Sequence, residues 1–133
     1  MEGSKMGKNI DDYIDRGLKG TPETKPSERR EYLSQLRERI ILALTNGQVI
    51  QKKPYKPISD LMKMYPSSKL YLDGDLDYMH LSKYIRIANE NNIPFTIVDD
   101  KASTTNIGLV LANPTAIDKD DIFVSKEDFQ RHL

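Results

Sequence analysis

The 133-residue chain contains no cysteine, which excludes disulfide bonds, thiolate metal sites and cysteine nucleophiles together. No apolar run is long enough to cross a bilayer, and the N-terminal residues lack the apolar core of a signal peptide. The 20 Lys and Arg residues balance 20 Asp and Glu residues, so no net charge draws the protein toward nucleic acid or anionic lipid. We therefore expect a cytoplasmic protein that makes no membrane contact.

The short motifs that signal catalysis or cofactor binding are also missing. The only histidines, His80 and His132, have no second histidine at ligand spacing, which argues against zinc. The seven glycines are scattered and form neither GxGxxG nor GxxxxGK[ST], and no GxSxG occurs. The sequence thus predicts no catalytic residue, no cofactor, no metal and no enzymatic activity.

The apolar pattern predicts one domain over residues 1–133, with residues 1–26 as an N-terminal arm that carries a short helix at 10–18. The longest predicted helix begins at Ser27 and ends at Asn46-Gly47, and a strand is predicted directly after it at 48–51.

After residue 51 the predicted elements alternate between helices and strands. Helices are predicted at 57–65, at 77–91 and after Ser125, and strands at 69–73, 94–98 and 121–124. Residues 105–112 fit either a strand or a helix, and we favour a helix because Leu111 lies one turn beyond Ile107 and Asn113-Pro114 follows. The alternation predicts an α/β fold, a small mixed four-stranded sheet flanked by helices in a layered sandwich.

Five aspartates follow two of the predicted strands: Asp73, Asp75, Asp77, Asp99 and Asp100. If the two strands are parallel neighbours, these carboxylates meet at one sheet edge and could hold Mg²⁺. The alternative is structural, with Asp-Gly as a turn, Asp77 as a helix cap and Asp99 at a strand end. We favour the structural alternative.

Basic residues cluster in two places, and they support an RNA-binding alternative. They are Arg29, Arg30, Arg37 and Arg39 on the long predicted helix, and Lys52, Lys53 and Lys56 in the 52–56 loop. Such residues could follow phosphates, but interleaved glutamates favour ion pairs on a solvated face, so nucleic-acid binding is not the first choice. Tyr55, between Pro54 and Pro57, is expected on the surface in a partner contact.

Several segments resemble the signature of the YueI-like family, small proteins of Gram-positive bacteria. They are Gly20-Thr21-Pro22, Lys25-Pro26, Glu28-Arg29, Tyr32-Leu33, Arg37-Glu38-Arg39-Ile40, Leu44-Thr45, Gly47-Gln48-Val49, Phe95-Thr96-Ile97-Val98 and Gly108-Leu109-Val110-Leu111-Ala112. The resemblance implies the fold above and a cytoplasmic protein, and it supplies no site residues. The order of elements also resembles kink-turn-binding ribosomal proteins, although their RNA-gripping Gly-x-Asn-Glu-x-x-Lys run is absent here.

These observations favour a non-catalytic cytoplasmic protein that acts through protein–protein contacts, as a homodimer and with an unidentified protein partner. The first alternative is an RNA-associated protein that uses the basic helix face and the 52–56 loop. The second is a divalent-metal-dependent enzyme at the Asp73/Asp75/Asp99 edge.

Overall fold

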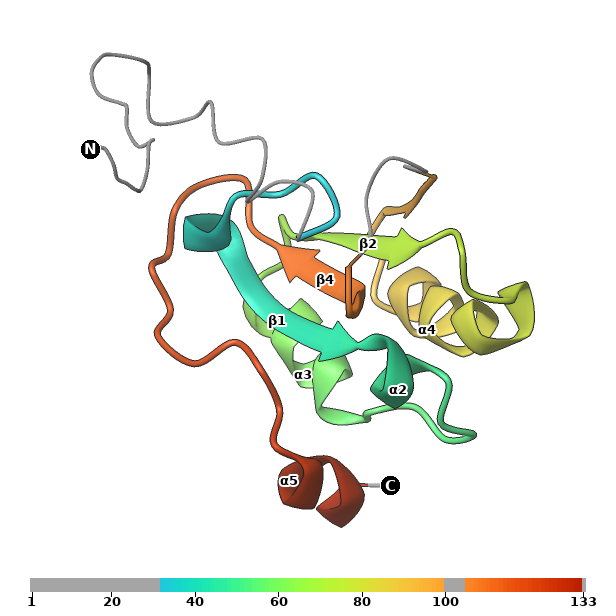
Figure 1. Ribbon diagram of the computed structural model, residues 1–133. Coiled ribbons are helices and arrows are strands. Elements are labelled where there is room, and N and C mark those ends of the chain that lie inside the picture. The colour runs from blue at the N-terminus through green and yellow to red at the C-terminus, as the bar shows by residue number, and fades with distance from the viewer. Residues whose placement is uncertain (1–31, 100–104, 133) are drawn as a thin grey trace, which may run out of the picture.

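A computed structural model of the protein describes residues 32–99 and 105–132, which form a mixed sheet with helices packed on one side (Figure 1). The four strands are β1 (Ile40–Thr45), β2 (Lys69–Asp73), β3 (Phe95–Val98) and β4 (Ile107–Ala112). Their order is β1-β4-β2-β3, with β4 antiparallel to both neighbours and β2 parallel to β3. The predicted α/β fold with a mixed four-stranded sheet is confirmed.

The helices are short, and most of them follow a strand or a turn. They are the 3₁₀ helix η1 (Arg37–Arg39), α2 (Asn46–Val49), α3 (Pro57–Met64), α4 (Tyr78–Glu90) and α5 (Lys126–Arg131). The predictions for α3, β2, α4, β3 and the helix after Ser125 are confirmed to within two residues. The predicted helix at 10–18 lies outside the described residues. No helix in the described ranges is long and apolar enough to cross a membrane.

The sheet buries side chains on both faces. The larger core lies under α3, α4 and α5 and includes Leu70, Leu72, Leu81, Tyr84 and Phe129. The smaller core lies on the opposite face and includes Leu33, Ile40, Ala43, Val110 and Ile122. Strands buried on both faces read as continuous apolar runs, and this explains two errors in the predicted elements.

The first error concerns residues 40–45, which were predicted to end a long helix and instead form β1. Leu33 and Ser34 adopt positive φ angles of 52° and 76°, so no helix runs through them. Ile40 and Ala43 enter one core while Ile41, Leu42 and Leu44 enter the other. A helical spacing of apolar residues was present, but every residue from Ile40 to Leu44 is buried, as in a strand covered on both faces.

The predicted strand at 48–51 is also wrong, because residues 46–49 form α2. Thr45 and Gln48 make a reciprocal capping box: the Thr45 hydroxyl accepts the Gln48 N–H, and the Gln48 side chain accepts the Thr45 N–H. The Thr-x-x-Gln pattern is readable in the sequence, but the β-favouring residues Val49 and Ile50 masked it.

The second apolar run, residues 107–112, forms β4, so the favoured helix was wrong there too. β4 has a strand on each side, pairing with both β1 and β2, and all its residues are buried. The predicted strand at 121–124 is reduced to one isolated bridge between Phe123 and Ala43.

Candidate functional site

The sequence offered one specific chemical hypothesis, a divalent-metal site at the sheet edge that carries Asp73, Asp75 and Asp99 (the aspartate edge). The structure tests the geometry of this site. β2 and β3 are parallel neighbours, as the hypothesis required, with Asp73 opposite Val98. Asp73 is 8% exposed, its Oδ1 accepts the Asp75 N–H at 2.9 Å, and burial raises the pKa of its carboxyl group. Within residues 32–99 and 105–132, no three His, Cys, Asp or Glu residues are placed to hold a metal ion. Asp73 thus completes the turn that ends β2, and Asp100 lies outside the described residues.

Asp77 stands at the N-cap position of α4, as predicted, but its side chain makes no capping hydrogen bond. Its backbone carbonyl accepts the His80 N–H at 2.9 Å. His80 is half-buried on α4 and His132 follows α5, so the two histidines belong to separate elements.

The basic helix face does not exist in the form that the RNA hypothesis required. Arg37 and Arg39 lie on η1, and the Arg37 Nη2 donates a hydrogen bond to the Asp120 carbonyl at 2.9 Å. Arg29 and Arg30 lie outside the described residues. The lysines of the 52–56 loop are exposed, so this loop keeps its positive charges in solvent.

Tyr55 was expected on the surface, and this prediction is wrong. Tyr55 is 7% exposed, and its ring stacks on Phe129 with centroids 5.6 Å apart and an interplanar angle of 12°. Its backbone N–H donates to the phenolic oxygen of Tyr84 at 2.9 Å. Burial raises the pKa of the Tyr55 hydroxyl, and the nearby Asp128 carboxylate adds to the increase. The ring lies against Phe129 of α5, where its aromatic surface is removed from water.

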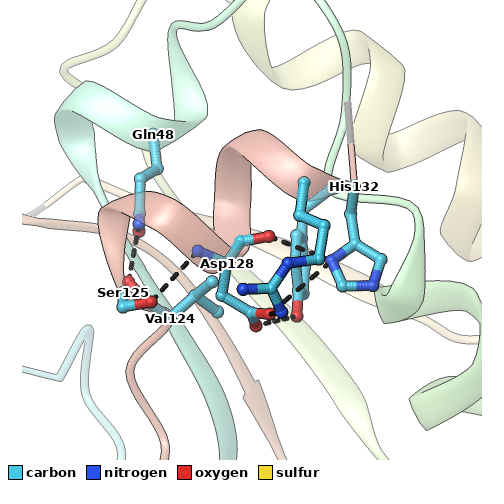
Figure 2. Close-up of polar contacts among 7 residues, drawn as sticks. Gln48, Val124, Ser125, Asp128 and His132 are labelled. Carbon is cyan, nitrogen blue, oxygen red and sulfur yellow. Dashed lines mark hydrogen bonds and ion pairs between the residues drawn. The ribbon is translucent and has the colours of Figure 1, made fainter.

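Figure 2 shows the polar contacts that join α5 to the rest of the chain. Ser125 caps the helix by accepting the Asp128 N–H at 3.1 Å, and the Gln48 Nε2 donates to the Val124 carbonyl at 2.8 Å (Figure 2). The Asp128 carboxylate accepts a hydrogen bond of 3.0 Å from the Arg131 Nη1 and one of 3.5 Å from the Tyr55 hydroxyl.

His132 completes this cluster. Its Nδ1 lies 2.9 Å from the Asp128 carbonyl oxygen, and its ring meets the Tyr55 ring edge-on at 5.7 Å. Proximity of a histidine, a carboxylate and a tyrosine would suit proton transfer. Here each of these groups contacts another member of the cluster, so the arrangement fastens α5 over the core.

A cavity of about 290 Å³ lies between α3 and the segment that leads to α5. Its wall is apolar apart from three carboxylates, one tyrosine and one lysine: Leu42, Tyr55, Pro57, Asp60, Leu61, Lys119, Asp121, Ile122, Phe123, Val124 and Asp128. The Lys119 Nζ donates to the Ile41 carbonyl at 3.0 Å. The three carboxylates outnumber the one lysine, so the wall combines an apolar surface with a net negative charge.

The outer edge of β3 is an edge of the sheet that exposes large apolar side chains. β3 ends the sheet, and its four residues, Phe-Thr-Ile-Val, carry no charge. Phe95 and Ile97 are 38% and 40% exposed. Because they lie in register with the buried Leu70 and Leu72, their side chains are on the face that carries α4.

The direction of the backbone groups of β3 follows from its pairing with β2. The Pro94 and Val98 carbonyls accept hydrogen bonds of 2.9 Å from Leu70 and Gly74, at the two ends of β2. Since backbone groups alternate in direction along a strand, the N–H and C=O groups of Phe95 and Ile97 point to the open side. No strand in the described part of the chain pairs with them.

The opposite edge of the sheet is protected. The Ala43 N–H of β1 donates to the Ile122 carbonyl at 2.9 Å, and Ala43 forms a bridge with Phe123. Lys119 covers the neighbouring Ile41 carbonyl. A covering loop and an edge lysine are devices that prevent strand-to-strand association. The predicted strand at 94–98 was correct, but its place at an unprotected edge could not be read from the sequence.

Comparison with known proteins identifies the family. Residues 7–123 match the family described as "Protein of unknown function (DUF1694)". The chain belongs to this family. The resemblance to the YueI-like family is confirmed as well, since this DUF1694 chain is 38% identical over 124 residues to the uncharacterized protein YueI of Bacillus subtilis (strain 168). That alignment covers 93% of this chain and 94% of YueI.

The crystal structure of YueI from Bacillus subtilis has the same fold as this DUF1694 chain. The two structures superpose with a TM-score of 0.75 at 38% sequence identity, covering 86% of this chain and 89% of the YueI chain. The family description assigns no activity, so the function is argued below from the surface of the chain itself.

Proposed function

We propose that this DUF1694 protein is a non-catalytic cytoplasmic protein that acts through protein–protein contacts and forms a homodimer through the open edge of β3. One observation carries the proposal: an uncharged edge strand exposes two large apolar side chains and its outward backbone groups.

An edge strand of this kind is a site for pairing with another strand. Soluble proteins normally protect such edges with lysine, proline, a bulge or a covering loop. β1 has two of these protections, whereas among residues 32–99 and 105–132 β3 has only Pro94 before its first residue. Pairing adds main-chain hydrogen bonds and removes the apolar side chains from water, which stabilises the complex by roughly 25 cal/mol per Å² of apolar surface buried.

The non-catalytic part of the proposal is supported by what the polar groups do. Asp73 closes a turn, and Asp128 and His132 both contact Tyr55, which ties α5 to the loop before α3. The cytoplasmic part is supported by the cysteine-free sequence, since small secreted domains commonly depend on disulfides.

Light scattering coupled to size-exclusion chromatography tests the proposal directly. The wild-type chain is expected at twice the monomer mass of 15.3 kDa at micromolar concentration. Ile97→Lys places a charge on the edge and should give a monomer. Met64→Lys is the matched control, because Met64 is 67% exposed on α3 and should leave the dimer intact. A monomeric wild type, or a dimer that Ile97→Lys leaves intact, would refute the proposal.

A further inference from the structure

The geometry of β3 also indicates how the second copy binds, an inference that rests on the proposed function. We infer that the β3 strands of two copies pair antiparallel about a two-fold axis beside Thr96, so that the two sheets join into one continuous sheet. The partner is a second copy of this chain, and the contact is isologous.

The outward backbone groups restrict the possible arrangements. Only residues whose N–H and C=O groups point to the open side can exchange hydrogen bonds with the partner, and within β3 these are Phe95 and Ile97. The two-fold symmetry adds a second condition: if residue i of one copy lies opposite residue j of the partner, residue j must lie opposite the partner's residue i. Three registers meet both conditions, with the axis at Phe95, at Thr96 or at Ile97.

The register centred on Phe95 loses hydrogen bonds. It places Ile97 opposite the partner's Ile93, and the Ile93 N–H is already donated to the Ala88 carbonyl at 2.8 Å. The Ile93 N–H therefore cannot donate a hydrogen bond to the carbonyl of the opposing Ile97.

The register centred on Ile97 creates an unfavourable side-chain pair. It places Phe95 opposite the partner's Asp99, so an apolar ring would cover a carboxylate and remove it from water. Burying a charge without a partner is costly, which disfavours this register.

The register centred on Thr96 has neither defect. Phe95 pairs with the partner's Ile97 and Ile97 with the partner's Phe95, so both residues of both copies exchange their N–H and C=O groups. Aromatic and β-branched residues directly opposite each other form a favourable cross-strand pair. On the other face, Thr96 meets the partner's Thr96, which is also a favourable pair.

The pairing also covers the exposed apolar surface. Phe95 and Ile97 lie on the sheet face that carries α4, because they are in register with core residues packed under that helix. The two-fold axis therefore sets the two α4 helices antiparallel on the same face of the joined sheet. The four side chains of the two copies lie next to one another on that face and cover one another.

Single-cysteine variants test the register, because the wild-type chain has no cysteine. Residues opposite each other in a non-hydrogen-bonded pair have Cα atoms about 4.5 Å apart, within the range of about 4.4–6.8 Å that a disulfide spans. In the Thr96-centred register, Thr96→Cys faces its own copy and should form a disulfide-linked dimer under mild oxidation. Phe95→Cys and Ile97→Cys should each form at least ten-fold less of it, and Met64→Cys is the control for random collision.

The outcomes separate this inference from the proposed function. A wild type that is monomeric by light scattering refutes both. A dimeric wild type with preferential cross-linking of Phe95→Cys or Ile97→Cys, or with no more cross-linking of Thr96→Cys than of Met64→Cys, refutes only the register. Amide hydrogen exchange of the wild type gives a check without substitutions: exchange at Phe95 and Ile97 should slow as protein concentration rises. Unchanged exchange there would contradict the inference.

Discussion

The phenolic oxygen of Tyr84 accepts a 2.9 Å hydrogen bond from the backbone N–H of Tyr55, and both residues are buried. This bond joins α4 to the loop before α3, and it gives a buried N–H outside the regular elements its partner. The same burial raises the pKa of Tyr84 to about 12.

Tyr84→Phe is expected to lower the free energy of unfolding at pH 7 by about 1–3 kcal/mol, because the Tyr55 N–H then lies buried without an acceptor. Urea denaturation followed by circular dichroism measures the change. Tyr78→Phe is the matched control, since Tyr78 is 63% exposed and its hydroxyl loss should change stability by less than about 0.5 kcal/mol. Equal effects of the two substitutions would contradict the structural role of the Tyr84 hydroxyl.

Tyr84→Phe should also change how the free energy of unfolding depends on pH in the alkaline range. The Tyr84 pKa is about 12 in the folded protein against an ordinary value of 10.0, so the folded protein keeps this proton where the unfolded chain loses it. The stabilisation is therefore full below pH 10 and is lost as pH rises toward 12, by roughly 2–3 kcal/mol in total. Tyr84→Phe lacks this loss, so the stability gap between the variant and the wild type should narrow between pH 9 and pH 11.5. A constant gap would show that Tyr84 does not titrate in this way.

Substitutions of Asp73 distinguish a structural role of this carboxylate in the turn after β2 from a role in metal binding. Asp73→Asn keeps an oxygen for the Asp75 N–H and removes a carboxylate whose pKa is raised by burial, so stability at pH 7 should stay equal or increase by up to about 1 kcal/mol. Any gain should disappear as pH falls below the ordinary carboxyl pKa of 3.8, where the unfolded chain also binds the proton.

The control for this experiment is Asp73→Ala, which removes the acceptor and should cost about 0.5–1.5 kcal/mol. Unfolding at pH 7 with and without millimolar Mg²⁺ completes the test. If Mg²⁺ stabilises the wild type but not the asparagine variant, the turn interpretation fails and a metal role returns.

Gly108 and Gly47 form a matched pair that tests the packing of α2 on β4. A Cβ atom at Gly108 would lie 2.7 Å from the Asn46 Oδ1 and 3.0 Å from Leu76 and Val49 side-chain carbons, whereas one at Gly47 would meet nothing closer than 3.9 Å. Gly108→Ala should therefore cost about 1–3 kcal/mol, and Gly47→Ala, inside α2, should be neutral or stabilising by up to about 1 kcal/mol. Thermal denaturation of both variants measures the contrast, and a neutral Gly108→Ala would contradict the close approach.

Local signals were sufficient where one strong pattern acted alone. The Pro57 start of α3, the capping serine of α5 and the β-branched run of β3 each predicted the correct element. The absence of cysteine and of phosphate-binding or nucleophile motifs follows from the residues alone. The same holds for the family, because the resembling segments lie along most of the chain.

Tertiary structure decided the rest. The residues of β1 and β4 are apolar on both sides, and whether such a run is a helix or a strand depends on the two layers that cover it. Tyr55 is buried because α5, more than 70 residues later in the chain, supplies Phe129 to stack on it. The open edge of β3 likewise results from strand order, which is set by pairings between distant segments and leaves no mark on the four residues themselves.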